Sequence, residues 1–269
     1  MFIQTLFYLR EYFFPSGCGG CGQALVEAEE AHYGLCGDCR AFLKQAFDAE
    51  KRCSICGKPL ITEKETCLLC RKKKTAGDES NEGSYSELLV KLLSLFPYTG
   101  KFKAILGAYK FGKSLGVGNF FGQCLCSVLE TFDPELFRDA AWVPVPPRPG
   151  KLKKQGWDQI EYLAGLLTGE YKRFERELPE ESQDPGSGLR LRLPVCRCLK
   201  RLPSRSQKEL NRLQRGSNLK GRILCIKKPP KTAIIFDDVF TTGATLNACA
   251  ASLLDGGAEK VYGICLFYD

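Results

Sequence analysis

The chain has 269 residues, of which 44% are hydrophobic and 26% are charged, and its formal net charge is +8. This composition is that of an ordinary globular protein, and the length allows one large domain or two smaller ones. No run of about 18 apolar residues occurs, which excludes a membrane-spanning helix, while the moderate positive charge suits an anionic ligand or a nucleic acid without requiring either.

The first ten residues, Met1 to Arg10, are mostly apolar but lack the basic start and the small-residue cleavage site of a signal peptide. We expect them to form a short amphipathic helix that packs on the following segment. Without a secretory signal, we expect a cytoplasmic protein. Its 15 cysteines would then lie in a reducing compartment, which favours metal binding over a disulfide framework.

Eight cysteines fall before residue 71, in four Cys-x-x-Cys pairs: Cys18/Cys21, Cys36/Cys39, Cys53/Cys56 and Cys67/Cys70. Two thiolates of such a pair can converge on one tetrahedral ion. The pattern therefore predicts two structural zinc ions with four cysteines each and no open position for catalysis. We predict that neighbouring pairs share an ion, and an interleaved arrangement is the alternative. A segment this poor in large apolar side chains needs the roughly 10–16 kcal/mol that structural zinc contributes.

The composition divides the chain into three parts. Residues 1–75 hold the predicted double zinc ribbon and the N-terminal helix. Residues 76–87 lack apolar periodicity, which is typical of a solvated linker. Residues 88–269 alternate between strand-like and helix-like apolar segments and predict an α/β domain.

Within the third part, residues 142–146 predict a strand that ends in a rigid loop. Asp158 is a suitable N-cap for a helix that extends to Leu167. The charged stretch 168–195 predicts a surface excursion. Near the C-terminus, a strand at 232–236, a helix at 244–254 and a strand at 261–267 predict a right-handed parallel crossover.

Two adjacent carboxylates, Asp237 and Asp238, follow the strand at 232–236, and α/β sheets bind ligands at this end of their strands. A turn then opens the next helix with Thr241, Thr242, Gly243, Ala244 and Thr245. Backbone N–H groups and hydroxyls of this turn can surround a phosphate at the positive end of the helix. Carboxylates beside a phosphate site suit a ligand with hydroxyls next to its phosphate, such as ribose 5-phosphate. In the less favoured alternative, the two acids only cap the helix.

The segment from Ala233 to Thr245 resembles the signature with which type I phosphoribosyltransferases bind 5-phosphoribosyl-1-diphosphate (PRPP), with Phe240 a mild departure. Nearly the whole chain resembles the ComF family, whose members join a double zinc ribbon to such a domain and are associated with competence for DNA uptake. Further motifs carry this resemblance: Phe14-Pro15, Tyr98, Lys110-Phe111, residues 143–146, residues 155–159, and Gln207 with Leu210, Arg215, Asn218 and Gly221.

The resemblance implies a type I phosphoribosyltransferase-like fold, a parallel sheet flanked by helices. It implies that Asp237 and Asp238 hold the ribose hydroxyls and act as the catalytic acids, and that residues 241–245 hold the 5-phosphate. The diphosphate would face the loop of residues 144–148, and Mg²⁺ would accompany PRPP. The candidates for the diphosphate contact are Lys110, Pro146 and Arg148.

One motif departs from the family pattern. At residues 155–159 the family usually has Arg-Gly-aromatic-Asn-Gln, whereas this chain has Gln-Gly-Trp-Asp-Gln. The chain thus lacks a cation and carries an acid in place of an amide. Other basic residues can surround an anionic ligand: Lys110, Arg148, Lys151, Lys153, Lys154 and Arg201.

Two functional hypotheses follow. The first is a PRPP-binding, phosphoribosyltransferase-like protein linked to DNA uptake; no residue stands out as a base for an incoming nucleophile, so its acceptor is not identified. The second is a non-catalytic competence factor that binds single-stranded DNA or a competence protein and uses the zinc ribbon for docking. Basic residues at helical spacing offer an additional nucleic-acid face: Arg205, Lys208, Arg212 and Arg215.

Overall fold

The structure is a computed structural model that describes residues 16–48, 51–60, 62–68, 70–71, 88–129, 139–168, 193–203 and 221–269. Some of the sequence-based predictions lie outside these residues. They are the N-terminal helix, the linker at 76–87, most of the excursion at 168–195, and the basic residues between Arg205 and Arg215.

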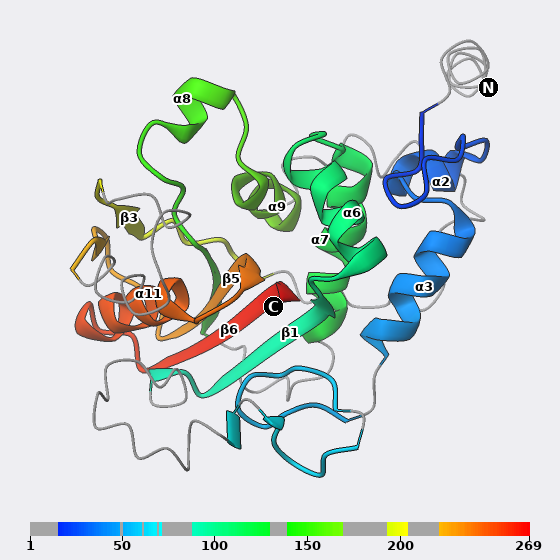
Figure 1. Ribbon diagram of the computed structural model, residues 1–269. Helices are drawn as coiled ribbons and strands as arrows, with labels where there is room; N and C mark the ends of the chain where they lie inside the picture. Colours follow the sequence, from blue (N-terminus) through cyan, green and yellow to red (C-terminus); the bar gives the residue numbers. More distant parts are fainter. Residues whose placement is uncertain are drawn as a thin grey trace.

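A four-stranded sheet with the order β1-β6-β5-β2 forms the centre of the fold (Figure 1). Its strands are β1 (Lys91–Pro97), β2 (Ala140–Pro144), β5 (Thr232–Phe240) and β6 (Lys260–Tyr268). All three strand pairs are parallel. Their near-continuous apolar runs are buried, because a parallel sheet is covered by other elements on both faces.

Helices cover the two faces of this sheet (Figure 1). One face packs against α6 (Gly100–Lys110), α7 (Leu115–Leu129) and α9 (Gln159–Thr168). The other packs against α11 (Ala244–Asp255), which also contacts the antiparallel hairpin of β3 (Leu199–Arg201) and β4 (Ile223–Cys225). The predicted α/β architecture is therefore confirmed.

Side chains along β5 alternate between the two faces. Ile234 and Phe236 belong to the apolar cluster under α6, α7 and α9, whereas Ala233 and Ile235 belong to the cluster under α11. This alternation decides where the two acids that follow can point.

The strand β5 is longer than the sequence predicted. We expected it to end at Phe236, but Asp237, Val239 and Phe240 continue the ladder with β6. The pairing comes from β6, a segment distant in sequence, which local patterns do not reveal. The two acids thus lie within the last residues of β5, and not in a loop after it.

The N-cap prediction for Asp158 is confirmed. Its Oδ1 accepts the backbone N–H groups of Ile160 at 3.0 Å and Glu161 at 3.1 Å. These bonds satisfy two of the donors that every helix leaves unpaired at its start. Helix α8 (Lys151–Gln155) precedes this cap and follows the loop after β2.

The cysteine-rich part packs directly on the α/β part. It contains α2 (Ala28–Tyr33) and α3 (Gly37–Phe47). Gly57, with φ of 67°, approaches β1 so closely that an added Cβ would lie 2.4 Å from the carbonyl oxygen of Leu92. Ser94 of β1 donates its hydroxyl to the carbonyl of Cys56 at 3.1 Å, and Arg52 donates to the carbonyl of Ser94 at 2.8 Å. The Cys53/Cys56 pair and the edge strand β1 therefore share one packed interface.

Within the described ranges, no helix combines the length and apolar character that crossing a membrane requires.

Candidate functional site

The eight paired cysteines form two separate clusters, one of Cys18, Cys21, Cys36 and Cys39, the other of Cys53, Cys56, Cys67 and Cys70. Within each cluster the sulfur atoms all lie within 4.8 Å of one another, as four ligands of one tetrahedral ion must. Neighbouring pairs share a cluster, so the sequential arrangement is correct and the interleaved one is wrong. Four thiols with no water-bearing position fit structural zinc.

In the first cluster, backbone N–H groups favour the thiolate form of Cys18, while burial raises the pKa values of Cys36 and Cys39. The Sγ of Cys18 accepts the N–H of Cys36 at 3.3 Å and that of Gly20 at 3.4 Å. Burial raises the pKa of Cys18, but hydrogen bonds from the backbone of Cys36, Cys21 and Gly20 and from the side chain of Cys39 outweigh burial and lower the pKa to about 6. The thiolate form that a zinc ion needs is therefore stabilised at this position.

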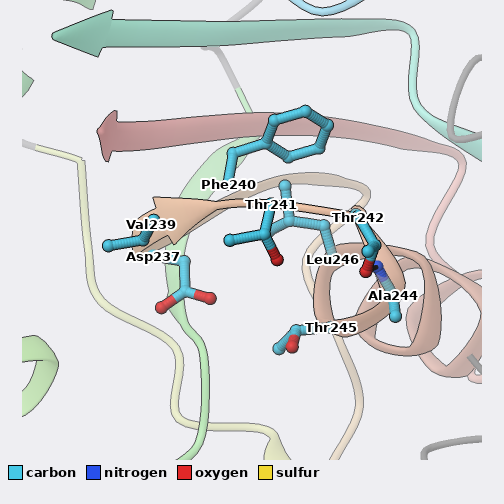
Figure 2. Close-up of a pocket in the computed structure, with 9 residues that line it drawn as sticks. Asp237, Val239, Phe240, Thr241, Thr242, Ala244, Thr245 and Leu246 are labelled. Carbon is cyan, nitrogen blue, oxygen red and sulfur yellow. Dashed lines mark hydrogen bonds between the residues drawn. The ribbon is translucent and has the colours of Figure 1, made fainter. Parts of the chain in front are cut away.

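The predicted ligand segment forms a pocket at the carboxyl end of β5 (Figure 2). The pocket is open to solvent, and the space between its walls, open solvent included, is about 260 Å³. Its lining consists of Asp237, Val239, Phe240, Thr241, Thr242, Gly243, Ala244, Thr245 and Leu246. Figure 2 shows the carboxylate of Asp237 and the hydroxyls of Thr241 and Thr245 turned towards the same space. An acid, hydroxyls and a helix start thus converge, as the sequence predicted.

The turn between β5 and α11 depends on Gly243. This residue is the N-cap of α11 and has φ of 81°, a left-handed conformation that other residues adopt only with strain. The hydroxyl of Thr242 accepts the N–H of Ala244 at 3.4 Å, which fixes the turn. The positive end of the helix dipole and the N–H groups of its first turn consequently face the pocket.

The two adjacent acids have different surroundings, because they project from opposite faces of β5. Asp237 lines the pocket, and its Oδ1 accepts the N–H of Asp238 at 2.8 Å. Asp238 lies on the other face and is buried. Its Oδ2 is 2.8 Å from the ammonium of Lys110, and Gln159 donates its amide N–H to the same oxygen.

A further cation supports this arrangement. The ammonium of Lys151 lies 2.6 Å from Oδ2 of Asp158 and also donates to the side-chain oxygen of Gln159. Gln159 is thereby held between Lys151 and Asp238. The last two residues of the motif at 155–159 therefore point inward: Asp158 caps α9 and pairs with Lys151, and the amide of Gln159 holds the carboxylate of Asp238.

The sequence predicted no role for Gln159 beyond its place in the motif at residues 155–159. A signal existed, since Gln159 lies three and four positions before Tyr162 and Leu163, both buried on the inner face of α9. Spacing of three and four residues places side chains on one face of a helix. A glutamine at this spacing is an inward-pointing polar group, which requires a partner.

The three residues predicted to face a diphosphate occupy different places. Lys110, at the end of α6, contacts Asp238. Pro146 is buried in the loop after β2, which stays close to β5 because Val145 donates its N–H to the carbonyl of Phe236 at 3.2 Å. Arg148 is exposed in the same loop. The structure therefore brings Lys110 into contact with Asp238, whereas Arg148 stays exposed on the loop after β2.

Burial raises the pKa of Asp237 from the usual 3.8 to about 7, and the negative charge of Asp238 adds to the shift. A carboxyl group that binds its proton more tightly in the folded state stabilises the fold at low pH. That contribution is complete below the usual pKa and is lost as the pH rises through the folded-state pKa.

We therefore expect the melting temperature of the wild type to fall relative to that of Asp237→Asn as the pH rises from about 5.5 to about 8. The asparagine keeps the shape of the side chain but cannot ionise. Thermal unfolding followed by circular dichroism at several pH values measures the difference. Parallel pH profiles of the two proteins would contradict the raised pKa.

Two comparisons with known proteins bear on the site. Residues 9–72 match the model of a family described as a double zinc ribbon domain. The range contains all eight clustered cysteines. The match supports the assignment of both clusters as structural zinc sites.

The second comparison extends beyond the cysteines. Competence protein ComFC of Streptococcus pneumoniae (strain ATCC BAA-255 / R6) is 24% identical to this chain over 229 residues, which cover 84% of each protein. The similarity therefore extends over most of the α/β part. The zinc-ribbon match and the similarity along most of both chains support the resemblance of this protein to the ComF family.

Proposed function

We propose that this chain is a competence-associated protein of the ComF type whose α/β part binds PRPP. One observation carries the proposal: Asp237 and the turn of residues 241–245 line the same pocket. The link to competence rests on the similarity to the pneumococcal competence protein ComFC. The division into a zinc part up to residue 75, a linker and a ligand-binding part from residue 88 belongs to the same proposal.

The pocket suits a phosphorylated ribose in a definite orientation. The 5-phosphate would bind the N–H groups and hydroxyls at the start of α11. Asp237 would accept a hydrogen bond from a ribose hydroxyl. Asp238 projects from the opposite face of β5 and is absent from the pocket lining, so its contacts with Lys110 and Gln159 would hold the end of β5, and with it Asp237, in position for the ribose.

The lining also limits the chemistry. Phosphoribosyl transfer would break the bond between ribose C1 and the diphosphate and form a bond from C1 to an acceptor. The two acids would stabilise positive charge on the ribose, and bound Mg²⁺ would neutralise the leaving diphosphate. Asp237 is the one group of the described lining that titrates near neutral pH, and it is already assigned to the ribose. We therefore assign no acceptor, and single-stranded DNA and competence proteins stay predictions as partners.

Substituting Asp238→Asn tests the role of the buried acid. The change removes the charge that Lys110 and Gln159 contact, so the affinity for ribose 5-phosphate should fall about tenfold to hundredfold. Isothermal titration calorimetry measures the affinity, and Asp255→Asn, an exposed carboxylate at the far end of α11, is the matched control. Equal affinity of Asp238→Asn and the wild type would remove Asp238 from the proposed site.

A further inference from the structure

The basic residues near the pocket differ in how their charges are compensated. Lys110 pairs with Asp238, and Lys151 pairs with Asp158. Lys153 and Lys154 are exposed on α8, where water solvates them. These four residues need no ligand to explain their positions. Arg201, by contrast, is buried away from water, and its Nε and Nη2 have no hydrogen-bond partner among the described residues.

Arg201 is the last residue of β3 and is only 8% exposed. Its Nε and Nη2 atoms are buried and have no hydrogen-bond partner among the described residues. No ion pair within the described chain neutralises its charge. Buried guanidinium N–H groups without acceptors are strongly unfavourable, so the Nε and Nη2 of Arg201 indicate a missing anion.

The charged neighbours of Arg201 place it beside the pocket. Burial lowers the pKa of Arg201, the positive charge of Arg148 lowers it further, and the negative charge of Asp237 opposes the shift. Arg148 follows β2, whose partner β5 carries Asp237 at its end. Arg201 lies on the hairpin that packs against α11, and it interacts with the pocket acid and with Arg148, so that each guanidinium raises the cost of the other's charge.

We propose that Arg201, together with Arg148, binds a second anionic group of the ligand, the diphosphate on ribose C1. This inference rests on the proposed function and deepens it, because it predicts tighter binding of PRPP than of ribose 5-phosphate. The turn at the start of α11 binds one anion, and Arg201 supplies a separate, buried anchor for another. Guanidinium groups suit this task since their forked N–H donors match phosphate oxygens.

Two ligand fragments separate the two anion sites in the full-length, zinc-bound protein. Inorganic diphosphate with Mg²⁺ probes the Arg201 site, and ribose 5-phosphate probes the turn. Arg201→Met should weaken diphosphate binding about tenfold to hundredfold and leave ribose 5-phosphate binding within about twofold of the wild type. Arg222→Met is the matched control, because Arg222 lies exposed on the same hairpin and should keep both affinities.

Thermal unfolding without ligand shows whether Arg201 stabilises the fold and so has only a structural role. Removing an uncompensated buried charge should leave the melting temperature of Arg201→Met equal to or above that of the wild type. Arg201→Lys keeps the charge without the fork and should bind diphosphate with intermediate affinity. Unchanged diphosphate binding in Arg201→Met, or an equal loss for both fragments, would overturn the inference.

The same titrations distinguish this inference from the proposed function. In one outcome, the wild type binds ribose 5-phosphate but Arg201→Met binds diphosphate as tightly as the wild type does. That outcome would leave the proposed function intact and remove the inference. Failure of the wild type to bind ribose 5-phosphate or PRPP would remove the proposed function. The diphosphate titration would then still decide whether Arg201 forms an anion site.

Discussion

Replacing Cys56 with serine should abolish zinc binding at the second cluster and unfold most of the chain. Cys56 is almost fully buried, and its carbonyl accepts the hydroxyl of Ser94 in β1. The loss of a structural zinc removes roughly 10–16 kcal/mol of apparent binding energy, about as much as the whole stability of a domain. Because this cluster packs on the sheet edge, the damage should reach the α/β part.

Zinc content and circular dichroism measure both effects. The wild type should contain two zinc ions per chain and unfold cooperatively, whereas Cys56→Ser should contain at most one and show no cooperative transition. Cys126→Ser is the control, because Cys126 lies on α7 outside both clusters and should keep both ions. A Cys56→Ser protein with two zinc ions and the melting temperature of the wild type would refute the cluster assignment.

Introducing a carboxylate into the turn should produce the largest loss of ligand affinity. Thr241 lines the pocket next to the start of α11, so Thr241→Asp would place a negative charge where the 5-phosphate is proposed to bind. Two like charges about 4 Å apart repel by about 4 kcal/mol near a protein surface. We therefore expect the affinity for ribose 5-phosphate to fall more than about hundredfold.

The effect should require the carboxylate at this position. Thr99→Asp adds the same group at the exposed N-cap of α6, where aspartate is well tolerated, and should keep the affinity of the wild type. Calorimetry with ribose 5-phosphate compares the three proteins. If Thr241→Asp binds as tightly as Thr99→Asp, the phosphate does not bind at this turn.

Local sequence patterns predicted the features that depend on near neighbours. Each Cys-x-x-Cys pair forms one knuckle by itself, and the two clusters join pairs that follow one another in the chain. The cap at Asp158 and the glycine turn at Gly243 depend on residues within four positions. Such features follow from capping and turn chemistry, which a single sequence displays.

Features that join distant segments could not be predicted in this way. Lys110, Gln159 and Asp238 meet on three separate elements, and nothing in their local sequence indicates the meeting. The extension of β5 depends on its pairing with β6. Similarly, the sequence placed Arg201 among six cations that can surround an anionic ligand, and only its burial without described partners for Nε and Nη2 separates it from the others. Only tertiary packing determines which polar groups are desolvated.

The proposed phosphoribosyl site is tested most directly by calorimetric titration of the wild-type, zinc-bound protein with PRPP and Mg²⁺. The account predicts saturable binding of one PRPP per chain, with competition by ribose 5-phosphate and no competition by ribose alone. Absence of saturable heat from a protein that holds two zinc ions and unfolds cooperatively would contradict the account.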